Sequence, residues 1–213
     1  MSRFLYPHIR AGLLCGLLLC CLSSAAQGQS QRLLVLGDSI SAAYGMSLEQ
    51  GWVALLQTRL AEQDVDVEVI NASISGETTG GGLRRLPALL EDHQPTLVLI
   101  ELGGNDGLRG YPLQRLQGNL AGMVELAQDS GADVILVPME IPPNYGSRYT
   151  AGFRDSFVRV AEQTDAELAP FILDGVAIDP NLMQADGIHP TVAAQPILLD
   201  NVLPTIEAAL AQE

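Results

Sequence analysis

Short apolar runs alternate along this chain with longer stretches of helical periodicity. The runs cover residues 33–36, 65–72, 97–100 and 134–137, and a shorter candidate covers residues 171–173. Strands this short and this apolar are typical of a parallel sheet that is buried on both faces. The alternation therefore predicts right-handed β–α–β crossovers and an α/β fold whose sheet is mostly parallel and covered on both sides.

Between these runs, apolar residues recur every three or four positions, as on one face of a helix. We expect helices around residues 48–60, 83–90, 113–127, 153–160 and 199–210. In open sheets of this kind, ligands bind beyond the carboxyl ends of the strands. The residues that directly follow each predicted strand are therefore the first candidates for a functional site.

The N-terminus has the pattern of a cleaved secretory signal. Arg3 and Arg10 give it a positive start, the apolar stretch of residues 11–22 follows, and small residues come next. A membrane-spanning helix needs about 20 apolar residues, so this stretch is too short to cross a bilayer. We expect cleavage after Ala26, which leaves residues 27–213 as one domain. The protein is then periplasmic or secreted, without stable membrane insertion after cleavage.

Composition excludes several kinds of chemistry. Cys15, Cys20 and Cys21 all lie in the predicted signal, so the mature chain can form no disulfide and has no thiol nucleophile. The sequence contains no lysine, which excludes a P-loop lysine and a Schiff base. Acidic residues outnumber basic ones by 25 to 11, so nucleic acid is not an expected partner. The sequence shows no metal-ligand cluster and no dinucleotide motif, and we expect no cofactor.

Three glycine-containing motifs follow predicted strands, and a fourth motif lies near the C-terminus. They are Gly37-Asp38-Ser39, Ser75-Gly76-Glu77, Gly103-Gly104-Asn105-Asp106 and Asp186-Gly187-Ile188-His189. Ester hydrolysis through a covalent intermediate needs a nucleophile, a base, a group that orients the base, and donors for an oxyanion. Ser39, His189 and Asp186 can fill the first three roles. The oxyanion donors can come from Ser39, Gly76 and Asn105.

Each motif also has a simpler structural explanation. A serine after a strand is often a helix N-cap, and Asn105 beside two glycines is a common turn former. Asp186 and His189 could form a surface ion pair at the start of a helix. Their three-residue spacing nonetheless lets the carboxylate reach one ring nitrogen while the other faces outward. We expect Asp38 to be a structural hydrogen-bond partner, and His93 to lie in a solvated loop.

In this order, the four motifs resemble those of the SGNH (GDSL-type) hydrolases. Residues 36–42, 71–78, 101–110, 142–146 and 186–190 are similar to the exported thioesterase I/lysophospholipase/arylesterase branch of that family. The resemblance implies a flavodoxin-like three-layer α/β/α fold with a sheet of about five parallel strands. It implies Ser39 as the nucleophile, with Asp186 and His189 completing a catalytic triad. The implied oxyanion hole comprises Ser39, Gly76 and Asn105.

The same branch acts on aryl esters, acyl thioesters and lysophospholipids, so the resemblance implies a small-molecule ester or a lipid as substrate. Loops after the third and fourth predicted strands carry apolar residues suited to an acyl chain, namely Leu108, Tyr111, Ile141, Pro142 and Tyr145. Two alternatives stay open. One is an O-acetylesterase for carbohydrates or other small molecules on the same scaffold, and the other is a non-catalytic periplasmic acyl-binding protein.

Overall fold

A parallel sheet of five strands forms the centre of the protein. The structure is a computed structural model and describes Met1 and residues 31–212. Its strands are β1 (Gln31–Gly37), β2 (Val67–Asn71), β3 (Leu97–Glu101), β4 (Asp133–Leu136) and β5 (Glu167–Leu168). They are ordered β2-β1-β3-β4-β5, and every pair of neighbours is parallel. This is the flavodoxin-like order that the resemblance implied. The predicted signal and its three cysteines lie outside the described residues.

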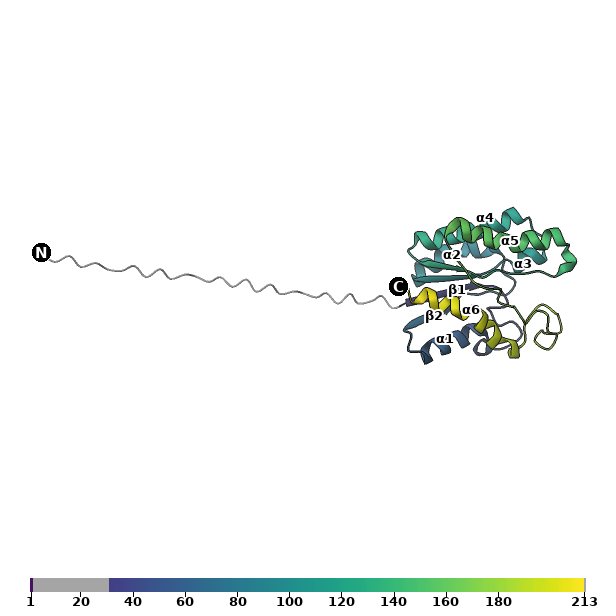
Figure 1. Cartoon of the computed structure of the whole chain (residues 1–213), viewed down its shortest axis with the longest axis horizontal. Helices are drawn as coiled ribbons and strands as arrows, with labels where there is room; N and C mark the ends of the chain where they lie inside the picture. Colours follow the sequence, from purple (N-terminus) through teal and green to yellow (C-terminus); the bar gives the residue numbers. More distant parts are fainter. Residues whose placement is uncertain (2–30, 213) are drawn as a thin grey trace.

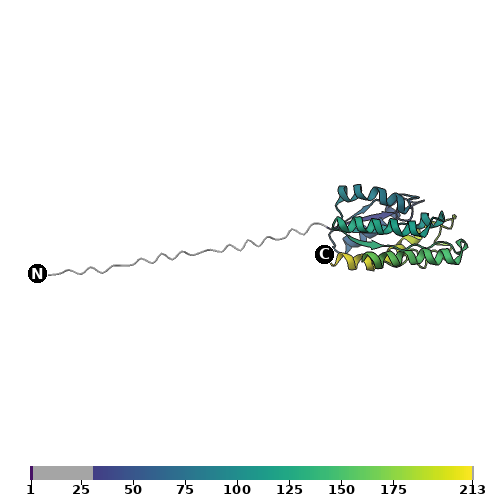
Figure 2. The same cartoon turned by 90° about the horizontal axis from the view of Figure 1, so that it is seen from above.

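Helices cover both faces of the sheet (Figure 1). On one face α1 (Trp52–Glu62) packs against α6 (Gln195–Leu210), and on the other α4 (Leu113–Asp129) lies between α2 (Thr79–His93) and α5 (Ser147–Thr164). Short elements complete the chain: the helix α3 (Gly104–Leu108) and the 3-10 turns η1 (Leu48–Gln50), η2 (Pro143–Tyr145) and η3 (Val192–Ala194). Figure 2 shows the long helices side by side from above. The predicted three-layer α/β/α architecture is confirmed.

The sheet is stable as a central layer because its inner strands β1 and β3 are apolar on both faces. In β1 and β3, residues 33–36 and 97–100 are at most 1% exposed. Fully burying a side chain of this kind contributes about 1.5–3 kcal/mol. Trp52, Phe153 and Phe157 are the largest fully buried side chains and belong to the same core. In the part of the chain that the structure describes, no helix is long and apolar enough to cross a membrane.

A fifth parallel strand is present, but its predicted position at residues 171–173 is wrong. Residues 171–173 form a turn instead, in which the Asp174 N–H donates to the Phe171 carbonyl, and β5 lies just before it. Pro170 explains the difference, because it has no N–H to donate and the ladder stops after Ala169 N–H binds the Leu136 carbonyl. The segment of residues 169–191 then connects β5 to η3 without a helix or a strand.

One smaller expectation is also corrected, and one short helix was not predicted. His93 is the last residue of α2 and is half-buried, where a solvated loop was expected. The helix α3 was not predicted, because its sequence of five residues contains two glycines and is too short to show a helical period. At the start of α2, Thr78 is the N-cap, and its hydroxyl accepts from the Gly81 N–H at 3.3 Å.

Gly103 connects β3 to α3 in a conformation that only glycine adopts easily. Its φ is 120°. A Cβ atom at this position would lie 2.9 Å from Phe157 Cζ and 3.1 Å from Leu116 Cδ1, and both of these side chains are buried. The close turn that starts α3 therefore depends on the absence of a side chain at this position.

We expect Gly103→Ala to lower the free energy of unfolding by about 2–4 kcal/mol, because backbone strain adds to overpacking of the core. Gly118→Ala is the matched control, since Gly118 lies inside α4 and a Cβ there meets nothing within 4 Å. That change should raise the unfolding free energy by about 0.5–1 kcal/mol through helix propensity. Urea unfolding followed by circular dichroism measures both. Two variants of equal stability would contradict the argument.

Candidate active site

Ser39 follows β1 at the carboxyl edge of the sheet, in a tight turn. The Ala42 N–H donates to the Asp38 carbonyl at 2.9 Å, and the Ile40 N–H donates to Asp38 Oδ1 at 3.1 Å. Ala43 adopts a left-handed conformation with φ of 54°. The chain therefore turns sharply after the strand, and Ser39 faces the cavity described below while being only 9% exposed.

His189 reaches Ser39 from a segment 150 residues further along the chain. Its Nε2 lies 2.9 Å from Ser39 Oγ, and its Nδ1 lies 2.7 Å from Asp186 Oδ2. The other carboxylate oxygen, Asp186 Oδ1, accepts the backbone N–H groups of Ile188 at 2.9 Å and His189 at 3.0 Å. Gly187, with φ of 65°, makes the turn that permits this. The geometry is the one that the three-residue spacing predicted.

These hydrogen bonds determine the charge of Asp186. The His189 side chain, followed by the backbone N–H groups of His189 and Ile188, lowers the pKa of Asp186 to about 2. Asp186 is therefore ionised throughout the neutral range. A carboxylate at this position keeps a proton on Nδ1 of His189 and leaves Nε2 free to accept the hydroxyl proton of Ser39.

Asn105 lies in the first turn of α3 and lines the same cavity as Ser39. Its Nδ2 donates to Asp38 Oδ2 at 3.0 Å, and the second hydrogen of the amide stays available for another acceptor. Gly76 follows β2 with φ of 79°, and its carbonyl accepts from Arg109 Nη2 at 3.2 Å. Within residues 31–212 the Gly76 N–H has no hydrogen-bond acceptor. Both groups are donors at the strand ends that can serve a negatively charged oxygen.

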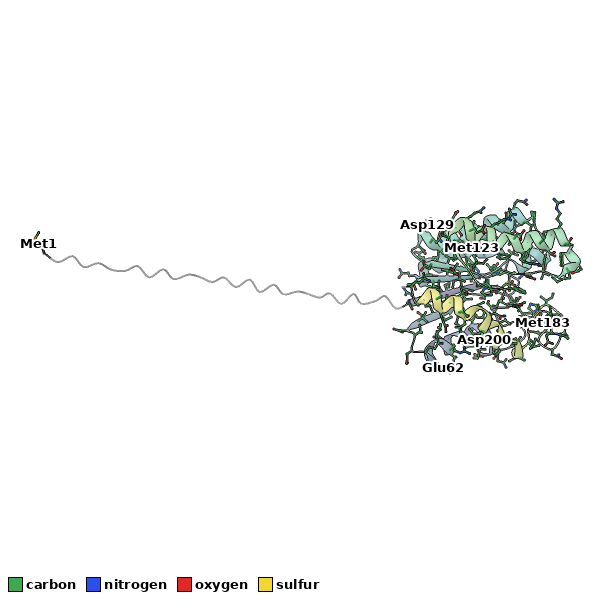
Figure 3. All side chains as sticks on the ribbon, in the orientation of Figure 1. Met1, Glu62, Met123, Asp129, Met183 and Asp200 are labelled. Carbon is green, nitrogen blue, oxygen red and sulfur yellow. The ribbon has the colours of Figure 1, made fainter. Side chains whose placement is uncertain are left out.

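A cavity of about 500 Å³ opens beside Ser39. Its walls come from α3, from the stretch after β4 and from the segment of residues 169–191. Met183, labelled in Figure 3, marks this end of the domain, opposite Glu62 and Asp129. The walls are mainly apolar: Ile40, Leu108, Met139, Ile141, Pro142, Pro143, Phe171, Leu173, Ala177, Ile178, Met183 and Ile188. A cavity of this size and character can hold an acyl chain.

Three of the five residues expected to contact the substrate line this cavity, namely Leu108, Ile141 and Pro142. Tyr111 and Tyr145 lie outside its lining. The Tyr145 hydroxyl donates to the Leu108 carbonyl at 2.8 Å, and the Tyr111 carbonyl accepts from the Tyr149 hydroxyl at 2.7 Å. The hydroxyls of Tyr145 and Tyr149 therefore brace the loop that carries Leu108 and Tyr111.

Sequence reasoning missed one wall of the cavity and one ring beside the histidine. The wall comes from residues 171–188, of which residues 171–173 were expected to form a strand. The ring is that of Tyr44, which lies with its centroid 4.2 Å from the His189 ring at an interplanar angle of 31°. The apolar run was a signal for the wall. No local pattern marks Tyr44, because its partner is distant in sequence.

Two carboxyl groups are buried beneath the turn that carries Ser39. Glu101 is fully buried, and its Oε2 accepts the Ser41 hydroxyl at 2.7 Å and the Asp38 N–H at 3.3 Å. Burial, and then the charge of Asp38, raise the pKa of Glu101 well above its usual value. Burial also raises the pKa of Asp38 to about 6, although hydrogen bonds from Ile40 and Asn105 oppose this. Asp38 makes the hydrogen bonds expected of it, to the Ile40 N–H and the Asn105 amide.

The raised pKa values predict how stability changes with pH. A carboxyl that holds its proton more tightly when folded stabilises the protein below its unfolded pKa, and this contribution is lost as the pH rises. The contribution of this pair to the unfolding free energy should therefore fall between about pH 4 and pH 6 and above. Glu101→Gln should make that fall shallower. Glu62→Gln, on the exposed end of α1, is the control. Urea unfolding at several pH values measures the unfolding free energy of each variant. The same dependence of that free energy on pH in wild type and Glu101→Gln would contradict the prediction.

The geometry agrees with comparisons to known proteins. Residues 35–196 match the model of the GDSL-like lipase/acylhydrolase family. The chain belongs to this family, as its sequence motifs indicated, and is an ester-hydrolysing enzyme.

Three relatives match most of the chain. It is 56% identical over 184 residues to esterase TesA of Pseudomonas aeruginosa, covering 86% of this chain and 92% of that protein. The chain is 51% identical over 182 residues to an arylesterase of Vibrio mimicus, and the match covers 85% of this chain and 90% of that protein. The chain is 45% identical over 168 residues to thioesterase 1/protease 1/lysophospholipase L1 of Escherichia coli K12, and the match covers 79% of each of the two proteins.

Solved structures show the same fold. The crystal structure of TesA matches with a TM-score of 0.83 and 56% identity, covering 84% of this chain and 99% of that chain. The psychrotrophic esterase EstA from Pseudoalteromonas sp., in a structure inhibited by monoethylphosphonate, matches with a TM-score of 0.82 and 48% identity. That match covers 85% of this chain and 99% of EstA. The fold predicted from the sequence is thereby confirmed.

Proposed function

We propose that this enzyme hydrolyses esters and thioesters by nucleophilic attack of Ser39, through an acyl-enzyme intermediate. The observation that carries the proposal is the continuous chain of hydrogen bonds from Ser39 Oγ through His189 to Asp186, at 2.9 and 2.7 Å. The Ser39 end of this chain of hydrogen bonds lies in a largely apolar cavity, where an acyl chain can meet the serine hydroxyl. A nucleophile, a base and an orienting carboxylate arranged in this way define the serine hydrolase mechanism.

In the first half of the reaction, Ser39 Oγ attacks the carbonyl carbon while His189 Nε2 takes the hydroxyl proton. Asp186 stabilises the imidazolium that forms. The carbonyl oxygen becomes an oxyanion, which accepts hydrogen bonds from the Ser39 N–H, the Gly76 N–H and the Asn105 amide. Collapse of this intermediate breaks the bond to the alcohol or thiol, which leaves with the proton from His189. In the second half, His189 takes a proton from water, which attacks the acyl-enzyme. The bond to Ser39 Oγ then breaks, Oγ regains its proton from His189, and the carboxylic acid is released.

We also propose the substrate class: aryl esters, acyl thioesters and lysophospholipids. The names of the relatives, an arylesterase and a thioesterase 1/lysophospholipase L1, support this range. Both Ile178 and Ile188 line the cavity and are also exposed, at 89% and 44%, so its apolar wall continues to the surface. This open side lets a long acyl chain enter and suits a small-molecule ester or a lipid, whereas the acidic charge of the chain does not favour nucleic acid.

Export is a further part of the proposal. Residues 1–26 are proposed as a cleaved signal and residues 27–213 as the hydrolase domain, with a periplasmic or secreted location. The positive start, short apolar core and small residues before Gln27 support it. Mass spectrometry of the protein from an osmotic-shock fraction should give a chain that begins near Gln27. Recovery of soluble protein with an intact Met1 would contradict it.

An acyl-length profile tests the substrate class against the O-acetylesterase alternative. The apolar cavity of about 500 Å³ favours medium and long chains over acetyl. We therefore expect kcat/KM for p-nitrophenyl esters to rise from acetyl to octanoyl, since each buried CH2 contributes about 0.8 kcal/mol. A profile that falls from acetyl onwards would favour the O-acetylesterase. Absence of Ser39 labelling by a fluorophosphonate would instead favour a non-catalytic acyl-binding protein.

If Ser39, His189 and Asp186 act together as a catalytic triad, the decreases in kcat caused by substituting them should not be additive in free energy. We expect Ser39→Ala and His189→Ala each to lower kcat by about 10⁴–10⁶-fold, and the double variant to be little worse. Asp186→Ala should retain more activity, because Asp186 orients the base without contacting the substrate. Asn105→Ala should lower kcat by about 10²–10³-fold with little change in KM.

Steady-state kinetics on a p-nitrophenyl ester measure these effects, with circular dichroism as the check on folding. His93→Ala is the matched control, since His93 ends α2 at the other edge of the sheet from Ser39. It should leave kcat unchanged. A folded Ser39→Ala with near-normal turnover would show that Ser39 is not the nucleophile.

A further inference from the structure

The base and the nucleophile come from segments that no shared strand or helix holds together. Ser39 is anchored by β1, whereas His189 lies in the segment of residues 169–191, between β5 and η3. Within that segment, an isolated bridge pairs Met183 with Pro190. A hydrogen bond of 2.9 Å between Ser39 Oγ and His189 Nε2 nonetheless requires the two segments to be placed within a few tenths of an ångström.

Tyr44 contacts both sides of this junction. Its backbone N–H donates to the Ser39 carbonyl at 3.1 Å, which ties it to the turn that carries the nucleophile. Its ring lies against the His189 ring, with centroids 4.2 Å apart. Tyr44 is 48% exposed and does not belong to the hydrophobic core. Burial therefore does not explain its position, whereas its contact with the imidazole does.

Gln184 joins the same two segments from the other side. Its side-chain Nε2 donates to the Tyr44 carbonyl at 2.8 Å and to the Pro190 carbonyl at 3.0 Å. Its backbone N–H donates to the His189 carbonyl at 2.7 Å. Gly45 leaves the space for this side chain, because a Cβ at Gly45 would lie 2.5 Å from Gln184 Oε1.

We propose that Tyr44 and Gln184 form a clamp that positions His189 against Ser39. Gln184 fixes the distance between the two backbone segments, and the ring of Tyr44 fixes the orientation of the imidazole. The face of that ring also favours the positive charge that His189 carries after it has taken the Ser39 proton. This inference rests on the proposed function, because it assigns Tyr44 and Gln184 as positioning residues for the proposed base.

The clamp predicts which substitutions at position 44 are tolerated. Tyr44→Phe keeps the ring, and kcat should stay within about threefold of the wild-type value. Tyr44→Leu keeps much of the bulk but removes the aromatic face, and Tyr44→Ala removes both. We expect these two to lower kcat by about 10–100-fold with little change in KM, because a misplaced base affects the transition state and not substrate binding.

The prediction for Gln184 uses the two carbonyls that it joins. Gln184→Glu replaces the donating amide by a carboxylate, which can donate to neither Tyr44 nor Pro190, so kcat should fall about as much as in Gln184→Ala. If both residues act as one clamp, the Tyr44→Ala/Gln184→Ala double variant should be little worse than the poorer single variant. Leu48→Ala is the matched control, since Leu48 follows the same turn and is 64% exposed. It should behave as wild type.

Two further measurements separate positioning from a general loss of structure. Thermal unfolding midpoints should change little, because neither residue belongs to the core. The downfield proton resonance of the His189 Nδ1–H, which bonds to Asp186 at 2.7 Å, should be sharp in wild type and in Tyr44→Phe. It should broaden in Tyr44→Leu and in Tyr44→Ala as the imidazole becomes mobile.

Several results would overturn the clamp. They are a wild-type kcat for Tyr44→Leu, equal losses for Tyr44→Phe and Tyr44→Ala, strictly multiplicative losses in the double variant, or an activity loss that follows a loss of stability. Ser39→Ala, measured in parallel, distinguishes this failure from failure of the proposed function. If Ser39→Ala is inactive and the clamp variants turn over normally, the clamp alone is wrong. If Ser39→Ala retains turnover, the proposed nucleophile and the clamp are both overturned.

Discussion

The pairing of β1 with β3 is the interaction on which the rest of the site depends. These two central strands align so that Gly37 lies opposite Glu101, and both strands are buried on their two faces. Because parallel strands end at the same edge, this register places the turn of Ser39 beside Gly103 and Asn105. It also brings the Glu101 carboxyl under the Ser39 turn, where it accepts the Asp38 N–H. A shift of register would separate Ser39, the proposed nucleophile, from the Asn105 amide that is proposed to stabilise the oxyanion.

The site combines a rigid half and an irregular half. Ser39 and Asn105 follow strands of the buried sheet, so the core fixes where they lie. Asp186 and His189 come from the segment of residues 169–191, which local hydrogen bonds hold in place. The same irregular segment supplies one wall of the apolar cavity beside Ser39. Because this segment adds no strand to the sheet, its shape is set by loop contacts and not by the strand register.

The acidic groups near the nucleophile have opposite environments, and the difference follows from burial. Asp186 is exposed and receives three hydrogen bonds, which lower its pKa to about 2 and keep it ionised beside the histidine. Glu101 and Asp38 are buried, which raises their pKa values. The charge of Asp186 suits it to orient the proposed base, whereas burial disfavours a negative charge on Glu101 beneath the Ser39 turn. Asp186 is thus suited to a catalytic role, whereas the buried pair Asp38 and Glu101 is suited to a structural one.

The sequence alone determined the layered α/β/α architecture and the candidate reactive residues. The apolar runs predicted the parallel sheet, because strands buried on both faces must be apolar throughout, and the motifs at their ends indicated Ser39, Asn105, Asp186 and His189. These are local patterns, and local patterns are visible in one dimension. The sequence could not determine how residues 169–191 are arranged, because Pro170 ended the fifth strand early and the rest of that segment has no period.

The tertiary structure decided the contacts between distant segments. The ring of Tyr44 on His189, the amide of Gln184 between two carbonyls, and the burial of Glu101 beneath Ser41 each join residues that are far apart in the chain. It also decided that Tyr145 braces a loop and that Tyr111 lies outside the cavity, which Ile178 and Met183 line. Such contacts depend on how helices and loops pack around the finished sheet, and no spacing within a single segment encodes them.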